Sequence, residues 1–294
     1  MAAPKKKTKT KRVPLPWDNR KARNEKLPNI IEKAVKHMST TLLKLIALVM
    51  MLIDHIATYI PGMPVWMHWI GRLAAPVFLF CMLWGFFHTH DRKIYLKRMY
   101  LFGFGMAVLD FAANVIVKDS YEPMTNDIFA TLFLVGVMVW IVEIYMEDSR
   151  RGLKYAVAFL LFQAVSLGIC NLALEMVPVK GIETITASVL PNVIYAEGGI
   201  NFIAMGVILY FVKDKKAYFS LVFAAFAGLI FLSEYGEAAN MARLVSKEGC
   251  QWMMIFALPF MLLYNGKKGK GFKYLFYVFY PLHILVLFVI GNAM

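Results

Sequence analysis

The stretch LKLIALVMMLIDHIATYIP, residues 43–61, is almost wholly apolar. It is long and apolar enough to cross the hydrocarbon core of a bilayer, which takes about 20 such residues in a helix. Yet Asp54 and His55 stand side by side near its end, and an ionisable side chain costs roughly 2.5–3.5 kcal/mol at the centre of a spanning helix. The stretch therefore predicts a membrane helix, and these two side chains are the first candidates for a functional site.

The composition of the whole chain agrees with a membrane protein. Of its 294 residues, 60% are hydrophobic, and the mean hydropathy is +0.58. Soluble domains contain about 45–50% apolar residues. We therefore expect one polytopic membrane protein rather than two soluble domains. The cysteines Cys81, Cys170 and Cys250 match no metal or disulfide spacing, and we interpret them as small buried apolar residues.

Residues 1–40 are a separate basic zone ahead of the expected membrane domain, 41–294. The zone opens with KKKTKTKR (5–12), and it lacks the apolar core of a cleaved signal peptide. Apolar residues at helical spacing predict a short amphipathic helix over 28–40, lying on the membrane surface. The net charge of +13 raises nucleic acid as a partner. Basic residues beside a span usually meet anionic lipid, so we expect membrane lipids and no nucleic acid.

Nine apolar segments predict an all-α bundle of about nine transmembrane helices. Between two of them, 178–196 is too short and too proline-broken to span alone, so it is either an outer loop or a re-entrant segment. The loops on one side hold 26 of the 32 Lys and Arg, and those on the other hold 4. The positive-inside rule then places the N-terminus in the cytoplasm and the C-terminus outside. The expected spans are 41–60, 69–88, 96–117, 127–146, 154–177, 197–212, 217–235, 250–264 and 273–292.

Ionisable residues of the first three spans share one depth. Asp54 and His55 lie roughly 20 Å from the cytoplasmic start of the first span, at 1.5 Å per residue. Arg72 enters the second span from outside, and Asp110 lies in the outer half of the third. Facing one another around a polar cavity would offset their burial cost. A simpler alternative is that Asp54 and Arg72 only pair to lock two spans together. Neighbours on a helix point about 100° apart, so we expect His55 to face the cavity and Asp54 to reach Arg72 or a neighbouring span.

A second polar set lies at the cytoplasmic side, in FFHTHDRKIYLKR (86–98) and YNGKKGKGFKYLFYVFYPLHIL (264–285). A loop rich in Gly and Lys can hold phosphates, and it can equally be an ordinary positive-inside loop. His88 and His90 do not share a helical face and have no evident third ligand, so we expect no metal. His283 lies roughly 15 Å into the last span, where the positive-inside rule does not explain it. The candidates of this set are His88, Arg92, Arg98, Asn265, Lys267, Lys268 and His283.

Three stretches, 43–60, 70–99 and 257–287, resemble the TraX family, membrane proteins named for pilin N-acetylation in conjugative systems. The shared features are an Asp–His in the first span, a Gly–Arg…Pro in the second and a His–Thr followed by basic residues. YNG and YPLH near the end complete the set. The resemblance covers the first three spans and the last two. It carries over Asp54, His55, Arg72, His88, Asn265 and His283.

The resemblance implies an acyltransferase that takes acetyl-coenzyme A from the cytosol and acylates an acceptor beyond the membrane. The donor phosphates would dock at the basic inner loops, and the acyl group would arrive near His283 or deeper, toward His55. Acetyl-coenzyme A is then a co-substrate, no metal is expected, and the location is the bacterial inner (plasma) membrane. The acceptor is a peptide N-terminus, a sugar or a lipid head group. The oligomeric state is left open, a homodimer included.

Our own assignment of roles follows the chemistry of each side chain. His55 is the general base on the acceptor amine or hydroxyl. Asp54 or Asp110 orients that imidazole as the carboxylate of a hydrolase triad does. Arg72 holds an acidic group of the acceptor or stabilises the developing oxyanion.

Two other function classes stay open. Polar residues inside spans also mark transporters and flippases, as a proton or solute path. Against transport, the chain shows no internal repeat, and nine spans do not halve evenly. A structural or assembly factor with an inactive site is the third class, and it predicts that His55→Ala leaves function intact. The polar residues that motivate the transport hypothesis are Gln163, Ser166, Cys170, Asn171, Glu175, Glu197, Asn201, Ser233, Glu234 and Glu237.

Overall fold

The computed structural model describes residues 38–125, 128–238 and 241–294, and the regular elements in this part of the chain are all helices. Seven helices are long and apolar enough to cross a membrane, and two further apolar helical segments, Gly199–Val212 and Cys250–Leu262, are shorter. The predicted all-α membrane bundle is therefore confirmed. The amphipathic helix expected over 28–40 lies almost wholly outside the described residues.

The helix starts follow local sequence signals. Ser39, Asp91 and Asp148 each accept a hydrogen bond from the backbone of the first turn that follows them, as short polar side chains do at helix N-termini. The elements are α2 (Thr40–Tyr59), α3 (Trp66–Gly71), α4 (Ala74–His88), α5 (Arg92–Ile116), α6 (Ile128–Glu147), α7 (Ser149–Met176), α8 (Ile182–Val189), α9 (Gly199–Val212), α10 (Lys216–Ala238), η1 (Arg243–Val245), η2 (Cys250–Ala257), α11 (Leu258–Leu262) and α12 (Lys273–Ala293).

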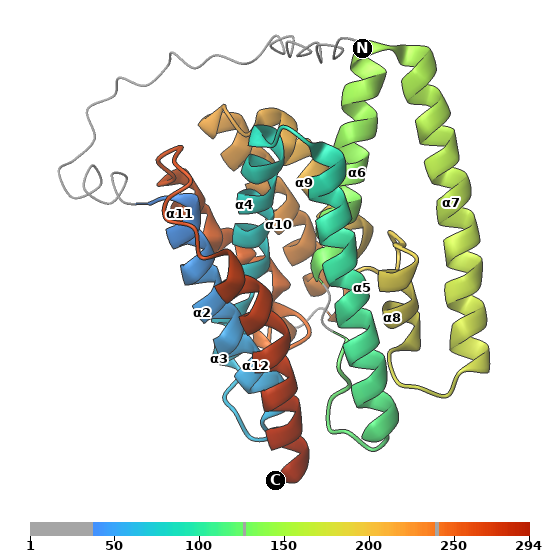
Figure 1. Cartoon of the computed structure of the whole chain (residues 1–294). Helices are drawn as coiled ribbons and strands as arrows, with labels where there is room; N and C mark the ends of the chain where they lie inside the picture. Colours follow the sequence, from blue (N-terminus) through green and yellow to red (C-terminus); the bar gives the residue numbers. More distant parts are fainter. Residues whose placement is uncertain (1–37, 126–127, 239–240) are drawn as a thin grey trace, which may run out of the picture.

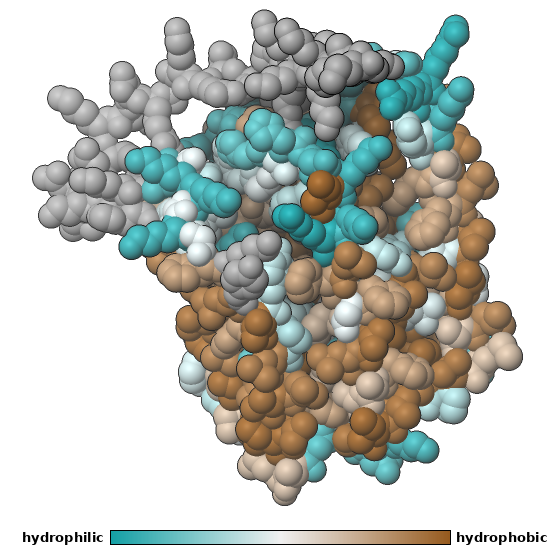
Figure 2. Space-filling model, viewed as in Figure 1, coloured by the Kyte–Doolittle hydropathy of each residue, from teal (hydrophilic) through white to brown (hydrophobic). Residues whose placement is uncertain are grey.

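The start of α2 and the loop 263–272 meet at one end of the bundle, where the N–H of Thr40 donates to the carbonyl of Lys267 at 2.9 Å (Figure 1). We call this the basic end, because the loops 89–91, 213–215 and 263–272 and their flanking helix ends carry most of the described Lys and Arg. The opposite end, where α2 and α12 finish, is the far end. Figure 2 shows polar side chains gathered toward the basic end above a broad apolar surface. Such an apolar belt is what a lipid-embedded bundle presents.

The helices differ in how much protein surrounds them. The most apolar window of the α3–α4 span is 56% buried and that of α6 is 50%, whereas those of α7 and α10 are each 17% buried. The span α3–α4 and α6 therefore form the centre of the bundle. The long apolar helices α7 and α10 are left with most of their surface for lipid.

The eighth expected span, 250–264, is built partly from a 3₁₀-helix. Cys250–Ala257 is 3₁₀-helical, and α11 continues from it. Because a 3₁₀-helix rises about 2.0 Å per residue, the 13 residues from Cys250 to Leu262 cover roughly 23 Å, against about 20 Å as a pure α-helix. The N–H of Asn265 then reaches the carbonyl of Met38 at the basic end, so this segment crosses most of the bundle.

The ambiguous segment 178–196 is re-entrant. Its helix α8 packs between α5 and α7 (Figure 1). The chain then turns near the middle of α7, where Ser166 donates to the carbonyl of Leu190 at 2.6 Å and Gln163 donates to that of Pro191 at 3.0 Å. Gln163 also accepts from the N–H of Val193 at 2.9 Å. These hydrogen bonds give partners to backbone groups of the irregular turn, which lipid cannot provide. The helix α9 can therefore begin inside the bundle.

Candidate functional site

Two cavities lie on the axis of the bundle. The basic-end cavity has a volume of about 330 Å³ and is lined by α2, α4, α5, α6, α12 and the loop before α12. The far-end cavity has a volume of about 420 Å³ and is lined by α2, α3, α4, α9, α10 and η2, with single residues of α6 and α12. The second is much more polar. Its polar lining residues are Asp54, His55, Arg72, Glu197, Asn201, Ser233, Glu234 and Gln251.

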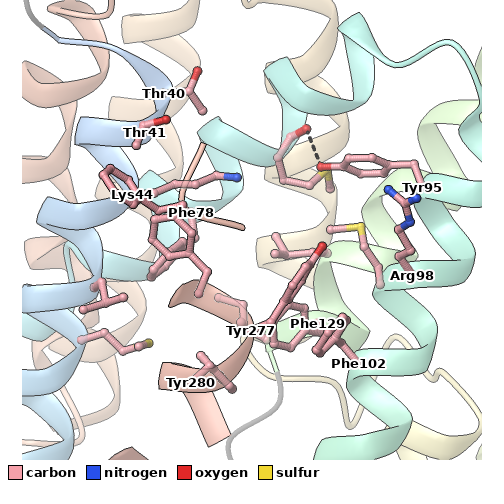
Figure 3. Close-up of a pocket in the computed structure, with 18 of the residues that line it drawn as sticks. Thr40, Thr41, Lys44, Phe78, Tyr95, Arg98, Phe102, Phe129, Tyr277 and Tyr280 are labelled. Carbon is pink, nitrogen blue, oxygen red and sulfur yellow. Dashed lines mark hydrogen bonds between the residues drawn. The ribbon is translucent and has the colours of Figure 1, made fainter. Parts of the chain in front are cut away.

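The two cavities meet at a neck, which we define as the four residues that line both: Met51, Phe78, Ile128 and Tyr280. They come from four different helices. On the basic side of the neck, Lys44 of α2 and Arg98 of α5 point into the cavity from opposite sides, with Tyr277 and Tyr280 below them (Figure 3). The cavities thus form two chambers on either side of one apolar constriction.

One face of α2 links the chambers. Lys44 and Leu48 line the basic-end cavity, Met51 lies in the neck and His55 lines the far-end cavity. Their spacing of four, three and four residues keeps them on one side of the helix. His55 follows Lys44 by 11 positions, which is roughly 17 Å along the helix axis.

A buried histidine pair lies beside the neck. Nδ1 of His55 is 2.8 Å from Nε2 of His283, and each side chain is only 7% exposed. Nδ1 of His283 is in turn 2.6 Å from the carbonyl oxygen of Phe279, one helical turn earlier. The rings of the two histidines are nearly parallel, with an angle of 10° between their planes. His283, expected at the donor site, therefore touches the proposed base directly.

The hydrogen-bond chain fixes the tautomers of both neutral rings. The carbonyl of Phe279 can only accept, so His283 carries its proton on Nδ1 and presents a lone pair on Nε2. His55 must then donate from Nδ1 to that lone pair. Its own Nε2 is left as a proton acceptor, and no hydrogen bond from the described residues occupies it. The arrangement matches the tautomer that a general base requires.

Asp54 is hydrogen-bonded to a histidine of the second span. Its Oδ1 lies 2.8 Å from Nδ1 of His68 in α3, a residue that is 4% exposed. His68 belongs to the second span, so of the two expected partners, Arg72 or a neighbouring span, this contact is the second. Gly71 allows the approach, since a Cβ built on it would collide with the Asp54 side chain. The carboxylate therefore reaches a neighbouring span, and His283 rather than Asp54 orients His55.

Arg72 sits at the break between α3 and α4 and lines the far-end cavity. Its guanidinium donates to the carbonyl of Lys247 at 3.0 Å and lies 3.5 Å from the sulfur of Cys250. These contacts tie the loop before η2 to the far end of the bundle.

The structure separates Asp110 from this group. It is 1% exposed in α5 and is not among the residues that line either cavity. One turn further on, the amide of Asn114 donates to the carbonyls of Met124 and Lys180 and accepts from the N–H of Met124. This part of α5 therefore holds two far-end loops in place.

The basic-end candidates fall into three groups. Arg98 and Lys268 line the basic-end cavity. Arg92 does not: it forms a buried ion pair with Glu143 of α6 and lies over the ring of Phe86. The third group, His88, Asn265 and Lys267, makes local hydrogen bonds at the basic end. Nδ1 of His88 is hydrogen-bonded to the carbonyl of Trp84. The side chain of Asn265 accepts from the N–H of Lys267, and the carbonyl of Lys267 accepts from the N–H of Thr40.

The polar row of α7, which suggested a transport path, is explained by the re-entrant segment. Gln163 and Ser166 hold its tip, and Asn171 accepts from the hydroxyl of Tyr195 at 2.6 Å. By contrast, Glu197 and Asn201 follow the tip and line the far-end cavity.

Sequence reasoning assigned no role to Lys44 and did not consider His68. Lys44 could have been found from its spacing, since it lies on the same face of α2 as His55. His68 stands four residues before Arg72 in an apolar stretch, but nothing in the sequence shows that it meets Asp54.

The apolar belt, the seven long helices and the buried polar site define a multi-pass membrane protein. The chain belongs to the TraX family, whose model, described as "TraX protein", matches residues 39–291. It is similar to a protein of Dichelobacter nodosus described as "Probable fimbrial assembly protein FimC, serogroup H1", with 28% identity over 253 residues, covering 83% of this chain and 92% of that protein. No solved structure matches the chain. The family match spans all of the cavity-lining residues named above.

Proposed function

We propose that the protein is a membrane acetyltransferase that takes acetyl groups from acetyl-coenzyme A at the basic end and transfers them to an amine or hydroxyl at the far end. One observation carries the proposal: two cavities on opposite sides of the bundle meet at a neck beside a buried histidine pair of defined tautomer. Two substrates held on opposite sides of a membrane need this arrangement.

The basic-end cavity suits a coenzyme A thioester. Lys44, Arg98 and Lys268 put positive charge on its lining, where phosphates would be bound. Below them the wall is mostly apolar and aromatic, including the stacked rings of Phe102 and Tyr277, whose centroids are 4.0 Å apart. A flexible pantetheine arm would lie along this wall, and the stretch of roughly 17 Å from Lys44 to His55 is the depth it would follow.

His55 is the general base in this mechanism. Its Nε2 takes the proton from the acceptor nitrogen or oxygen as that atom forms its bond to the acyl carbon, and the carbon–sulfur bond breaks. The proton leaves with the thiolate, so His55 returns to its starting form. His283 holds the imidazole by accepting from Nδ1 of His55, and its own proton stays on Nδ1 of His283, which donates to the carbonyl of Phe279. Because His283 is neutral, it orients His55 without the charge that a carboxylate would add.

Arg72 and Asp54 act from the far-end cavity. The guanidinium of Arg72 is the cation placed to hold an acidic group of the acceptor or to stabilise the oxyanion. Asp54 lines the same cavity as His55 and is held in place by its hydrogen bond to His68. We assign no role in this mechanism to Asp110, because it lines neither cavity.

The acceptor and location follow from the family and from charge. A fimbrial or pilin subunit is the acceptor that the family and the Dichelobacter protein favour. The basic end faces the cytoplasm by the positive-inside rule, in a bacterial inner membrane.

The first test is binding of acetyl-coenzyme A to the full-length protein in nanodiscs, measured by thermal shift and calorimetry. Wild type and His55→Ala should both be stabilised, because the base contacts the acceptor rather than the phosphates. Acetyl transfer to acceptor peptides should fall by about 10²–10⁴-fold in His55→Ala. No stabilisation of either protein would overturn the proposal. The second candidate, a transporter or flippase, would then be favoured, because Glu197 and Glu234 also face the far-end cavity.

A further inference from the structure

The neck between the cavities is closed by large apolar side chains. Met51, Ile128 and Tyr280 are each 7–8% exposed, and Phe78 completes the ring of four. The ring of Tyr280 packs edge-on against Phe129, with centroids 5.0 Å apart, which limits its freedom to move aside.

The neck lies directly over the histidine pair. Met51 is one helical turn before His55 in α2, and Tyr280 is three residues before His283 in α12. The Tyr280 ring also meets the His283 ring edge-on at 6.0 Å. A donor bound in the basic-end cavity therefore brings its acyl group to His55, which lines the far-end cavity, by way of the neck.

We propose that these four neck residues select the acyl group by length, so that the donors are short-chain acyl thioesters such as acetyl-coenzyme A. This inference rests on the proposed function and deepens it. In an acetyl thioester the carbonyl carries only a methyl group, so little more than the carbonyl has to fit in the neck. A longer chain must displace packed side chains or pass through to the far-end cavity, where the acceptor binds.

The size of the effect follows from packing. Forcing extra methylenes into a close-packed apolar site weakens the complex by an amount equivalent to about tenfold to a hundredfold in affinity. We therefore expect hexanoyl-coenzyme A to bind about tenfold to a hundredfold more weakly than acetyl-coenzyme A. Free coenzyme A, which has no acyl tail, should bind about as well as acetyl-coenzyme A.

The test is calorimetric titration of the full-length protein in nanodiscs with coenzyme A and its acetyl, butyryl and hexanoyl esters. In Phe78→Ala and in Met51→Ala, the removal of neck volume should bring the hexanoyl-to-acetyl affinity ratio close to one. Two variants are used so that the test can still be made with one of them if the other does not fold. Leu132→Ala is the matched control: this residue lines only the basic-end cavity, so its variant should keep the wild-type ratio.

The outcomes separate the two proposals. If wild type binds coenzyme A and all its esters equally, the neck does not select by length, and this inference fails while the proposed function stands. The inference also fails if Leu132→Ala relaxes the ratio as much as the neck variants do. If wild type binds neither coenzyme A nor any ester, the proposed function itself fails. A wild-type preference for short esters, relaxed only by the neck variants, supports the inference.

Discussion

The histidine pair can be tested without knowing the acceptor, through the stability of the protein. In His283→Phe the ring is kept as an apolar group of similar shape, but the lone pair that accepts from Nδ1 of His55 is lost. The His55 donor is then buried without a partner, since that side chain is only 7% exposed. The same argument applies in reverse to His55→Phe, which leaves Nε2 of His283 without its donor.

A buried donor left unsatisfied costs about 1–3 kcal/mol, whereas replacing both partners by apolar groups is nearly neutral. Each single variant should therefore lower the free energy of unfolding by about 1–3 kcal/mol. The double variant, His55→Phe with His283→Phe, should lose less than the sum of the two. The difference is a coupling energy of about 0.5–3 kcal/mol, the range found for residues in direct contact.

The assay is thermal and denaturant unfolding of the four proteins of this cycle in one nanodisc preparation. Leu282→Phe is the matched control, because it adds a phenylalanine to the neighbouring position of α12 at a side chain that is 54% exposed. It should leave stability nearly unchanged. Additive losses in the double variant would refute the claim that His55 and His283 share a hydrogen bond.

Three further predictions separate residues that the sequence could not tell apart. Lys268→Ala should weaken acetyl-coenzyme A binding by roughly fivefold and reduce its salt dependence, while Lys267→Ala should have a smaller effect, both measured by calorimetry at two salt concentrations. Arg92→Ala should lower the free energy of unfolding by about 3–5 kcal/mol because it leaves a buried carboxylate unpaired, whereas Arg98→Ala should change stability by less than about 0.5 kcal/mol and weaken donor binding instead. Gln163→Leu should cost about 1–3 kcal/mol for each backbone group of the re-entrant tip that it leaves unsatisfied, seen as a lower melting temperature.

A specific result would contradict each of these predictions. Equal losses of affinity in the two lysine variants would mean that the whole loop, rather than the cavity wall, meets the phosphates. An Arg92→Ala protein as stable as wild type would show that its ion pair is not structural. For Gln163, the control is Val165→Leu at a side chain that is 63% exposed. Equal melting temperatures of these two variants would contradict the assignment of Gln163 to the re-entrant tip.

The sequence predicted only part of the candidate site. Asp54, His55 and Arg72 were expected around one cavity, and all three line the far-end cavity. His283 was expected near mid-membrane but assigned to the donor, because a sequence gives the depth of a residue in its span and not the direction in which it faces. Asp110 was expected at the same depth; it is buried in α5 and lines neither cavity, and its part in the site stays a prediction.

The roles of the basic residues were also only partly predictable from the sequence. Arg92 and Arg98 stand six residues apart in one loop-proximal stretch and look alike in sequence. Only the packing of α5 against α6 pairs one of them with Glu143 and leaves the other on the cavity wall. The polar row of α7 likewise suggested a path for solutes, and its partners turned out to be backbone groups of the re-entrant tip.

The amino-acid sequence was enough to predict that this protein lies in a lipid bilayer and that it is a bundle of helices. Hydropathy and length predict helices in lipid because every backbone polar group in a bilayer must find its partner within the chain, and a helix is the local way to do so. The tertiary structure alone decided which side chains meet across helices: His55 with His283, Asp54 with His68, and the four residues of the neck. Such contacts join residues up to 228 positions apart. They depend on the rotation and offset of whole helices, which local patterns of hydrophobicity and charge leave undetermined.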